Sequence, residues 1–272
     1  MSKNISRDKK LIAGNWKMHN SIKETSQLLD DLTKEYESIH SEHVEMVVCP
    51  TFTSLETANG KLNAQKSGIK LGAQNVSWEN SGAFTGEISP QMLKEHGVEY
   101  VIIGHSERRA MFGDNNETVN KRLKNTLKNN LKPIVCVGET LSERENCQTD
   151  KVIKQQVCES LKNMNSFVAN NNSDSQLTVA YEPVWAIGTG KTATSLEAND
   201  VCKLIRTTLS GMFGEEFGEH TRILYGGSVN AKNASDLFSQ TDIDGALVGG
   251  AALKALDFID IYKAAIVNTN CR

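Results

Sequence analysis

Eight apolar or β-branched runs recur along the 272-residue chain, and their spacing is the feature that most restricts its fold. Their starts lie 35, 24, 31, 32, 45, 45 and 23 residues apart. Each interval is too long for a hairpin and long enough for a helix that crosses over between parallel strands. The pattern therefore predicts an α/β fold, either a closed barrel or a doubly wound sheet. The predicted strands are Lys10–Asn15, Glu45–Cys49, Ile69–Ala73, Tyr100–Gly104, Lys132–Val137, Leu177–Glu182, Arg222–Tyr225 and Gly245–Val248. Eight helices are expected to alternate with them, and helix starts are predicted at Ser21, Ser89 and Ser195.

The composition, with 39% hydrophobic and 23% charged residues, is typical of a globular protein and indicates neither disorder nor a membrane span. Barrels of this length are commonly single domains, so we expect one domain over residues 10–272. Residues 1–9 are polar and are expected to form a flexible extension. Because they lack the apolar core of a signal peptide, we expect a cytoplasmic protein. The asparagine- and serine-rich stretch Asn163–Gln176 is predicted to be an exposed loop insertion.

The charged residues give no sign of a macromolecular ligand. The net charge is −3 and the basic residues are scattered, so we expect no nucleic-acid partner. The six cysteines include no Cys-x-x-Cys pair and are expected to be reduced thiols. His40 and His43 lie near Cys49, but two histidines in a charged segment are more often solvated than bound to metal. We therefore expect a small-molecule substrate, no metal and no membrane association.

The stretch Ala180–Lys191 combines a carboxylate, a proline and two closely spaced glycines after an apolar run. Pro183 favours an extended conformation for the residue before it, so Glu182 is predicted to end a strand and face a loop. The glycines Gly188 and Gly190 can absorb dihedral change. The apolar tip Val184–Ile187 suits a lid that excludes water, although an ordinary surface loop would have a similar sequence.

Three further motif matches, two of them within this stretch, fail on spacing or on a missing partner. A Walker loop needs glycine where Trp185 stands. The relaxed Gly-x-Gly pattern at Gly188 does not directly follow its strand, which argues against a dinucleotide fold, although a nicotinamide oxidoreductase remains an alternative. His105-Ser106-Glu107 has the His-x-Glu form of zinc deaminases but lacks their Pro-Cys-x-x-Cys partner. A non-catalytic role has no supporting motif.

Polar residues and glycines gather just after the predicted strands. The carboxyl ends of the strands share one face in a barrel, and active sites of that fold are built there. Backbone N–H groups of paired glycines approach an anion closely, so a phosphorylated substrate is expected, with a lysine as an added charge. A carboxylate base and a histidine acid or hydrogen-bond donor complete the predicted site. The residues are Asn15, Lys17, His105, Glu107, Glu182, Gly226, Gly227, Ser228, Gly249 and Gly250.

Seven segments between Lys10 and about Val267 resemble the triosephosphate isomerase family. These segments are long and specific, and they follow one another along the chain in the order that the family has. The segments are Gly-Asn-Trp-Lys-Met at 14–18, Phe-Thr-Gly-Glu-Ile-Ser at 84–89, Gly-His-Ser-Glu-Arg-Arg at 104–109, Cys-Val-Gly-Glu at 136–139, Ala-Tyr-Glu-Pro-Val-Trp-Ala-Ile-Gly-Thr-Gly-Lys-Thr-Ala-Thr at 180–194, Tyr-Gly-Gly-Ser-Val at 225–229 and Leu-Val-Gly-Gly-Ala at 247–251.

The resemblance implies a homodimeric (β/α)8 TIM barrel that interconverts dihydroxyacetone phosphate and D-glyceraldehyde 3-phosphate through an enediolate, without a metal or organic cofactor. Glu182 would abstract the carbon-bound proton, and His105 would polarise the carbonyl as a neutral imidazole. Lys17 and Asn15 would stabilise the oxyanion. The phosphate would be bound by backbone N–H groups of Gly188, Ser228, Gly249 and Gly250.

The chain departs from the family pattern at two places. His19-Asn20 stands where the family commonly has Asn-Gly, toward the dimer contact, and Ala252 replaces a serine near the phosphate. The loop Phe84–Glu87 would reach into the partner subunit. Other phosphate-binding barrel enzymes remain an alternative.

Overall fold

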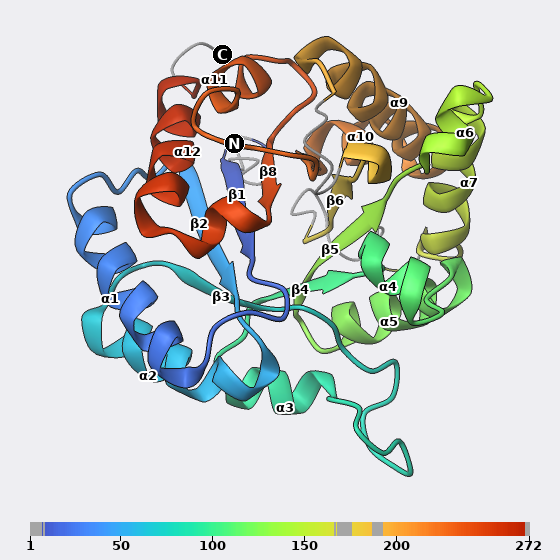
Figure 1. The fold of residues 1–272 in the computed structure, drawn as a ribbon. Coiled ribbons are helices and arrows are strands. Elements are labelled where there is room, and N and C mark those ends of the chain that lie inside the picture. The colour runs from blue at the N-terminus through green and yellow to red at the C-terminus, as the bar shows by residue number, and fades with distance from the viewer. Residues whose placement is uncertain (1–6, 8, 166, 168–175, 187–192, 270–272) are drawn as a thin grey trace.

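The computed structural model describes residues 7, 9–165, 167, 176–186 and 193–269, and within them eight parallel strands form a closed barrel (Figure 1). The first strand pairs with the last, with Leu11 opposite Gly245. The predicted barrel is confirmed, and the alternative of a doubly wound sheet is wrong because such a sheet has two free edges. The strands are β1 Lys10–Asn15, β2 Val44–Cys49, β3 Lys70–Ala73, β4 Tyr100–Ile103, β5 Lys132–Val137, β6 Thr178–Tyr181, β7 Arg222–Tyr225 and β8 Gly245–Val248.

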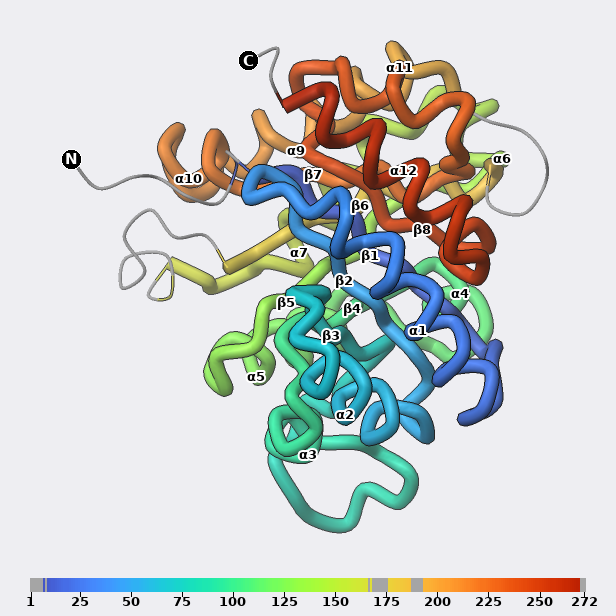
Figure 2. Tube along the Cα trace, turned by 90° about the vertical axis from the view of Figure 1, so that its left-hand side faces the viewer, coloured from blue at the N-terminus to red at the C-terminus, as the bar shows by residue number. Residues whose placement is uncertain are grey.

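Helices surround the barrel, and several connections between strands carry two of them (Figures 1 and 2). The prediction of a single helix per connection is therefore wrong for β4–β5, β5–β6 and β6–β7. No helix in the described ranges is long and apolar enough to cross a membrane. The helices are α1 Ile22–Glu37, η1 Phe52–Ser54, α2 Leu55–Gln65, α3 Pro90–Glu95, α4 Ser106–Met111, α5 Asn116–Lys128, α6 Leu141–Glu145, α7 Thr149–Ser160, η2 Val184–Ala186, α9 Ser195–Phe213, α10 Glu215–His220, α11 Ala234–Phe238, η3 Gly250–Leu253 and α12 Ala255–Val267.

Side-chain caps fix where the helices begin. Ser21 forms a capping box with Glu24 at α1, and Ser89 accepts from the N–H of Met92 at α3. Both starts were predicted from the sequence. The longest helix, α9, is capped by Thr194, one residue before the predicted Ser195. The reason is that Glu197 lies three residues after Thr194, the spacing that a capping box requires.

The core consists of two layers that follow the alternation of side chains along each strand. Leu11 and Ala13 of β1 point into the barrel, where they join Tyr100, Ile134 and residues of the other strands. The intervening residues point outward and pack against the helices in a second, larger cluster. The barrel interior is therefore packed with side chains, and its carboxyl end is left for a site.

The connection between β3 and α3 projects away from the body of the molecule. It runs over residues 74–89 and appears as an extended teal loop in both views (Figures 1 and 2). Its base is fastened by Arg122, whose guanidinium donates to Asn75 Oδ1 at 2.9 Å and to the carbonyl of Val76 at 2.6 Å. Phe84 in this loop is 40% exposed.

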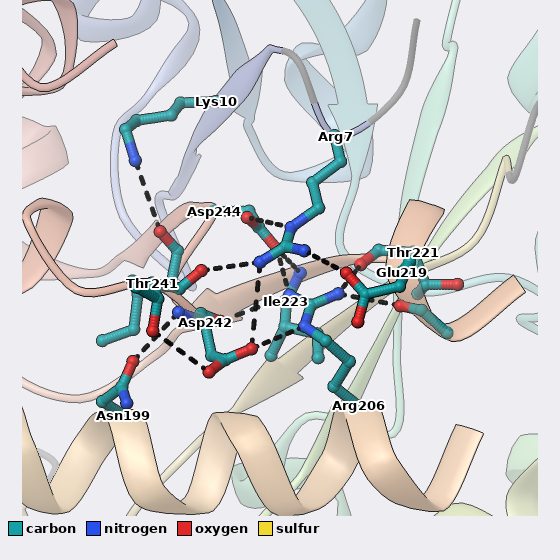
Figure 3. Close-up of polar contacts among 12 residues, drawn as sticks. Arg7, Lys10, Asn199, Arg206, Glu219, Thr221, Ile223, Thr241, Asp242 and Asp244 are labelled. Carbon is teal, nitrogen blue, oxygen red and sulfur yellow. Dashed lines mark hydrogen bonds and ion pairs between the residues drawn. The ribbon is translucent and has the colours of Figure 1, made fainter. Parts of the chain in front are cut away.

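A network of charged side chains fastens the barrel below the amino ends of its strands (Figure 3). Arg206 of α9 donates to Asp242 Oδ1 and to Asp244 Oδ2, both at 2.7 Å. Arg7, which precedes β1, reaches Asp244 Oδ1 at 3.1 Å and Glu219 Oε2 of α10 at 2.7 Å. Arg7 thus ties the segment before β1 to the segment before β8, and Arg206 ties α9 to the same segment.

These contacts also bear on the predicted flexible extension. Arg7 lies inside the stretch 1–9, yet its side chain is fixed by three ion pairs. Residues 1–6 and 8 lie outside the described part of the chain, so the domain boundary at residue 9 stays a prediction. The same holds for most of the predicted insertion Asn163–Gln176, because 166 and 168–175 are not described.

Replacing Arg206 should destabilise the protein far more than replacing Arg7. Arg206→Met leaves the fully buried Asp244 without its closest cation, which costs about 3–5 kcal/mol of unfolding free energy. Arg7→Met removes a partly exposed partner and should cost about 1 kcal/mol or less. Denaturant unfolding at a fixed protomer concentration measures both. Lys263→Met, in an exposed pair with Asp260, is the control, and equal effects of the three changes would contradict this account.

Candidate active site

A cavity of about 450 Å³ opens at the carboxyl ends of the barrel strands. Every predicted site residue in the described ranges lines it except Glu107, which pairs with Lys17. Gly188 falls in 187–192, outside those ranges. The structure therefore brings together side chains from β1, β4, β6, β7 and β8. The cavity is lined by Asn15, Lys17, His105, Glu182, Gly226, Gly227, Ser228, Val229, Asn230, Leu247, Gly249, Gly250, Ala251, Lys254 and Asp257.

Glu182 is a buried carboxylate with two hydrogen-bond donors. It directly follows β6, and its backbone N–H donates to the carbonyl of Val137 at 2.7 Å. The side chain is only 2% exposed; Oε2 accepts from the N–H of Ser106 at 2.8 Å, and Oε1 lies 2.9 Å from Nε2 of His105. Burial raises the pKa of Glu182, but His105 and the Ser106 N–H together lower it by more, so the net pKa lies below the ordinary value. The carboxylate is therefore ionised at neutral pH, as a base must be.

His105 is placed by the first turn of α4, which it caps. Its Nδ1 accepts from the backbone N–H of Glu107 at 3.2 Å, so this nitrogen carries no proton. The ring proton is then on Nε2, which donates to Glu182. Burial lowers the pKa of His105, while the carboxylates of Glu182 and Glu107 raise it above its ordinary value. The backbone contact selects the neutral Nε2–H tautomer, a hydrogen-bond donor aimed at the cavity.

Lys17 brings an ammonium group into the same cavity from a strained backbone. Its φ is 52°, in the left-handed region that costs a non-glycine residue of order 1 kcal/mol. The backbone N–H donates to Asn15 Oδ1 at 3.0 Å, and Nζ donates to Glu107 Oε1 at 2.6 Å. Strain held by surrounding contacts is typical of a functional position.

Glycines make room for the carboxylate and for a ligand. A Cβ on Gly226 would lie 2.9 Å from Cγ of Glu182, and one on Gly138 would overlap the backbone carbonyl oxygen of Glu182. At the other side of the cavity, Gly249 and Gly250 lead into η3, so backbone N–H groups are close to the open space. Such groups can bind an anion.

The segment after Glu182 is tied to its neighbours by side chains. Trp185 Nε1 and the hydroxyl of Tyr181 both donate to Oε1 of the fully buried Glu139, at 2.9 and 3.0 Å. Ser228 Oγ donates to the carbonyl of Ala186 at 2.9 Å. Because its hydroxyl is used in this way, a contribution of Ser228 to anion binding comes from its backbone N–H.

Three cavity or supporting residues were not assigned roles from the sequence. Glu107 pairs with Lys17, Glu139 fixes Trp185, and Lys254 adds a second positive charge to the lining. The sequence placed Glu107 after the fourth strand with His105, but their spacing was weighed only as a deaminase motif and Glu107 was given no role. No group of three histidine, cysteine, aspartate or glutamate side chains with metal-binding geometry occurs among the residues that the structure describes.

The arrangement can move a proton and bind an anion. A carboxylate base and a neutral imidazole face the same space, which permits proton abstraction beside a carbonyl that the imidazole polarises. An ammonium group and backbone N–H groups lie at its border. The geometry thus suits an anionic substrate with a weakly acidic C–H bond.

Comparison with known proteins gives one consistent result. A family model described as triosephosphate isomerase matches residues 10–265. A triosephosphate isomerase of Alkaliphilus oremlandii is 50% identical over 255 residues, which are 94% of this chain and 99% of the relative. One of Clostridium tetani is 48% identical over 260 residues, 96% of each chain. One of Dictyoglomus turgidum is 47% identical over 259 residues, with 94% and 99% covered.

Gly138→Ala should disturb the site although residue 138 does not line the cavity. The added methyl group must displace the backbone that carries Glu182, and a shift of about 1 Å in a catalytic group can lower turnover about 100-fold. Isomerisation of glyceraldehyde 3-phosphate, the activity expected from the sequence, measures this. Gly60→Ala in α2, where a Cβ meets nothing within 4 Å, is the control. Normal turnover by Gly138→Ala would show that the backbone tolerates the methyl group.

Proposed function

The chain belongs to the triosephosphate isomerase family, and from this premise we propose that Glu182, His105 and Lys17 are its catalytic residues. The chain interconverts dihydroxyacetone phosphate and D-glyceraldehyde 3-phosphate, a step of glycolysis and gluconeogenesis. The observation that carries the assignment is the meeting of these three side chains in one cavity. The same cavity has the glycine-rich ends of β7 and β8 at its border.

In the proposed mechanism Glu182 takes the proton from C1 of dihydroxyacetone phosphate. The electrons of the C–H bond form the C1–C2 double bond, and the carbonyl oxygen becomes the oxyanion of an enediolate. The Nε2–H of His105 donates to this oxygen, and Lys17 stabilises its charge. The oxygen on C2 then takes the Nε2 proton of His105, and His105 takes the proton of the C1 hydroxyl in its place. Glu182 returns its proton to C2, which gives glyceraldehyde 3-phosphate. Each step is a proton transfer or a charge stabilisation by these side chains, so the proposal includes no cofactor.

The contact between His105 and Glu182 implies a movement during the reaction. Their side chains lie 2.9 Å apart, which leaves no space for a substrate carbonyl between them. Glu182 must therefore leave the Ser106 N–H and turn toward the substrate carbon, while His105 stays fixed by Glu107. Asn15 is proposed to assist Lys17 at the oxyanion.

The phosphate is proposed to bind at the ends of β7 and β8. Backbone N–H groups of Ser228, Gly249 and Gly250 supply the donors, with Gly188 as a further donor from outside the described ranges. This is favoured by the absence of side chains at the glycines, which lets the backbone approach an oxygen closely. Lys17 adds its charge, and its Cε lies 3.6 Å from the Cβ position of Gly249.

Glu182→Gln should abolish most of the activity without preventing ligand binding. The amide keeps the volume of the side chain but cannot accept the proton, so kcat should fall by about 10³-fold or more. Inorganic phosphate should remain a competitive ligand of similar affinity. Glu99→Gln, at the opposite end of the barrel, is the control for the chemical change. Near-normal turnover by Glu182→Gln would refute its role as the base.

We also propose a cytoplasmic homodimer. All five cysteines in the described ranges are free thiols, which supports a reducing compartment. The projecting loop at Phe84–Glu87 and the 92% exposed Met18 support a contact with a second copy of the chain. Because Met18 follows Lys17 directly, loss of this contact would loosen the catalytic lysine.

Thr85→Arg should yield monomers with much reduced activity. A buried unpaired charge opposes association, and the loop around Lys17 then loses its support. Sedimentation velocity and isomerase assays over the same protomer concentrations measure both effects. Thr207→Arg, the same change on the exposed surface of α9, should leave the dimer intact. A monomer of Thr85→Arg with full activity would contradict the proposed link between assembly and catalysis.

A further inference from the structure

The backbone conformation of Lys17 needs an explanation, because nothing in its own side chain favours it. Its φ of 52° places it in the left-handed region, where its Cβ crowds the backbone. It stands between the fully buried Trp16 and the exposed Met18, where the chain leaves the barrel. A residue keeps such a conformation only when surrounding contacts hold both of its peptide groups.

Two amide side chains hold these peptide groups from opposite sides. The N–H of Lys17 donates to Asn15 Oδ1 at 3.0 Å. Its carbonyl oxygen accepts from Nε2 of Gln74 at 2.8 Å, and the same nitrogen donates to the carbonyl of Cys49 at 2.9 Å. Gln74 follows β3 directly, and Cys49 is the last residue of β2. A single amide nitrogen therefore links the strained lysine to the ends of two barrel strands.

The far end of the lysine is held separately. Nζ pairs with Glu107 at 2.6 Å, so the ammonium group and the backbone are fixed by different elements. The carboxylate of Glu107 can follow a displaced lysine, whereas the carbonyl contact defines where the side chain starts. The position of the ammonium in the cavity thus depends on the backbone contact with Gln74.

We propose that Gln74 is a positioning residue for catalysis, which keeps Lys17 in its left-handed conformation and so directs the ammonium group to the substrate. The inference rests on the proposed role of Lys17. Gln74 also stands at the base of the projecting loop 74–89. The loop and the catalytic lysine of one chain are therefore joined through one side chain, and a displacement of the loop base is transmitted to the site.

The chemistry of the contact limits which side chain can replace Gln74. The amide nitrogen carries two hydrogens and donates to two carbonyl oxygens. Glutamate has the same size but only acceptors, so its oxygens would face the two carbonyls and repel them. Methionine fills the space without donating. The expected order of activity is glutamine, then methionine, then glutamate.

The first measurement is steady-state kinetics of Gln74→Met and Gln74→Glu in the full chain. We expect kcat/KM to fall about tenfold in Gln74→Met, because the two hydrogen bonds that hold the backbone of Lys17 are lost. It should fall further in Gln74→Glu. The inhibition constant of inorganic phosphate should rise in the same order. Asn120→Asp is a matched control: its amide also donates to two backbone carbonyls, those of Ser160 and Lys162, far from the cavity.

The second measurement separates positioning from general support of the fold. In a double-mutant cycle with Lys17→Met, Gln74→Glu should change the residual kcat/KM less than about twofold, because no ammonium is left to position. Its effect on the unfolding temperature should be the same in both backgrounds. A purely structural role predicts additive losses of activity, and additivity would overturn the inference.

The outcomes also distinguish the inference from the proposed function. If Lys17→Met keeps wild-type activity, the proposed role of Lys17 fails, and the inference fails with it. If Lys17→Met is impaired while both Gln74 variants match Asn120→Asp, only the inference fails. Should Gln74→Glu not fold, the cycle with Gln74→Met decides the question, because methionine introduces no repulsion.

Discussion

The burial of one carboxylate is the constraint around which the carboxyl end of this barrel is built. Glu182 is removed from water and remains ionised because the Ser106 N–H and the Nε2–H of His105 donate to it. Gly138 and Gly226 leave the space that it occupies. In the proposed mechanism the side chain gives up these donors when it turns toward the substrate. Without these donors, burial raises the pKa of Glu182, and the carboxylate is more basic when the proton is transferred.

The supporting contacts around this carboxylate come from different strands, which only a closed barrel brings to one rim. His105 takes its tautomer from the N–H of Glu107, and Glu107 also pairs with Lys17. Glu107 therefore acts on the imidazole through its backbone and on the ammonium through its side chain. Strain at Lys17 opposes folding, and the arginine network below the barrel helps to offset it (Figure 3).

The strands could be predicted almost to the residue because parallel strands buried on both faces are continuous apolar runs, and each is followed by a turn. The cluster of site residues followed from the same reasoning, since strand ends share one rim. The contacts of Gln74 with Lys17 and of Arg7 with Asp244 could not be predicted, because they join residues 57 and 237 positions apart. The short additional helices α4 and α6, which precede α5 and α7 in their connections, were missed because five or six residues show no helical period.

The most direct test of the account is isomerisation in D2O, because its central claim is that Glu182 moves a carbon-bound proton. The wild-type protein is given glyceraldehyde 3-phosphate, and the dihydroxyacetone phosphate formed at low conversion is analysed by NMR. A carboxylic acid on the protein exchanges its proton with solvent during the life of the enediolate, so the account predicts deuterium at C1 of the product. A product without deuterium at C1 would mean a direct transfer of hydrogen between the two carbons, and it would contradict the assignment of Glu182 as a base.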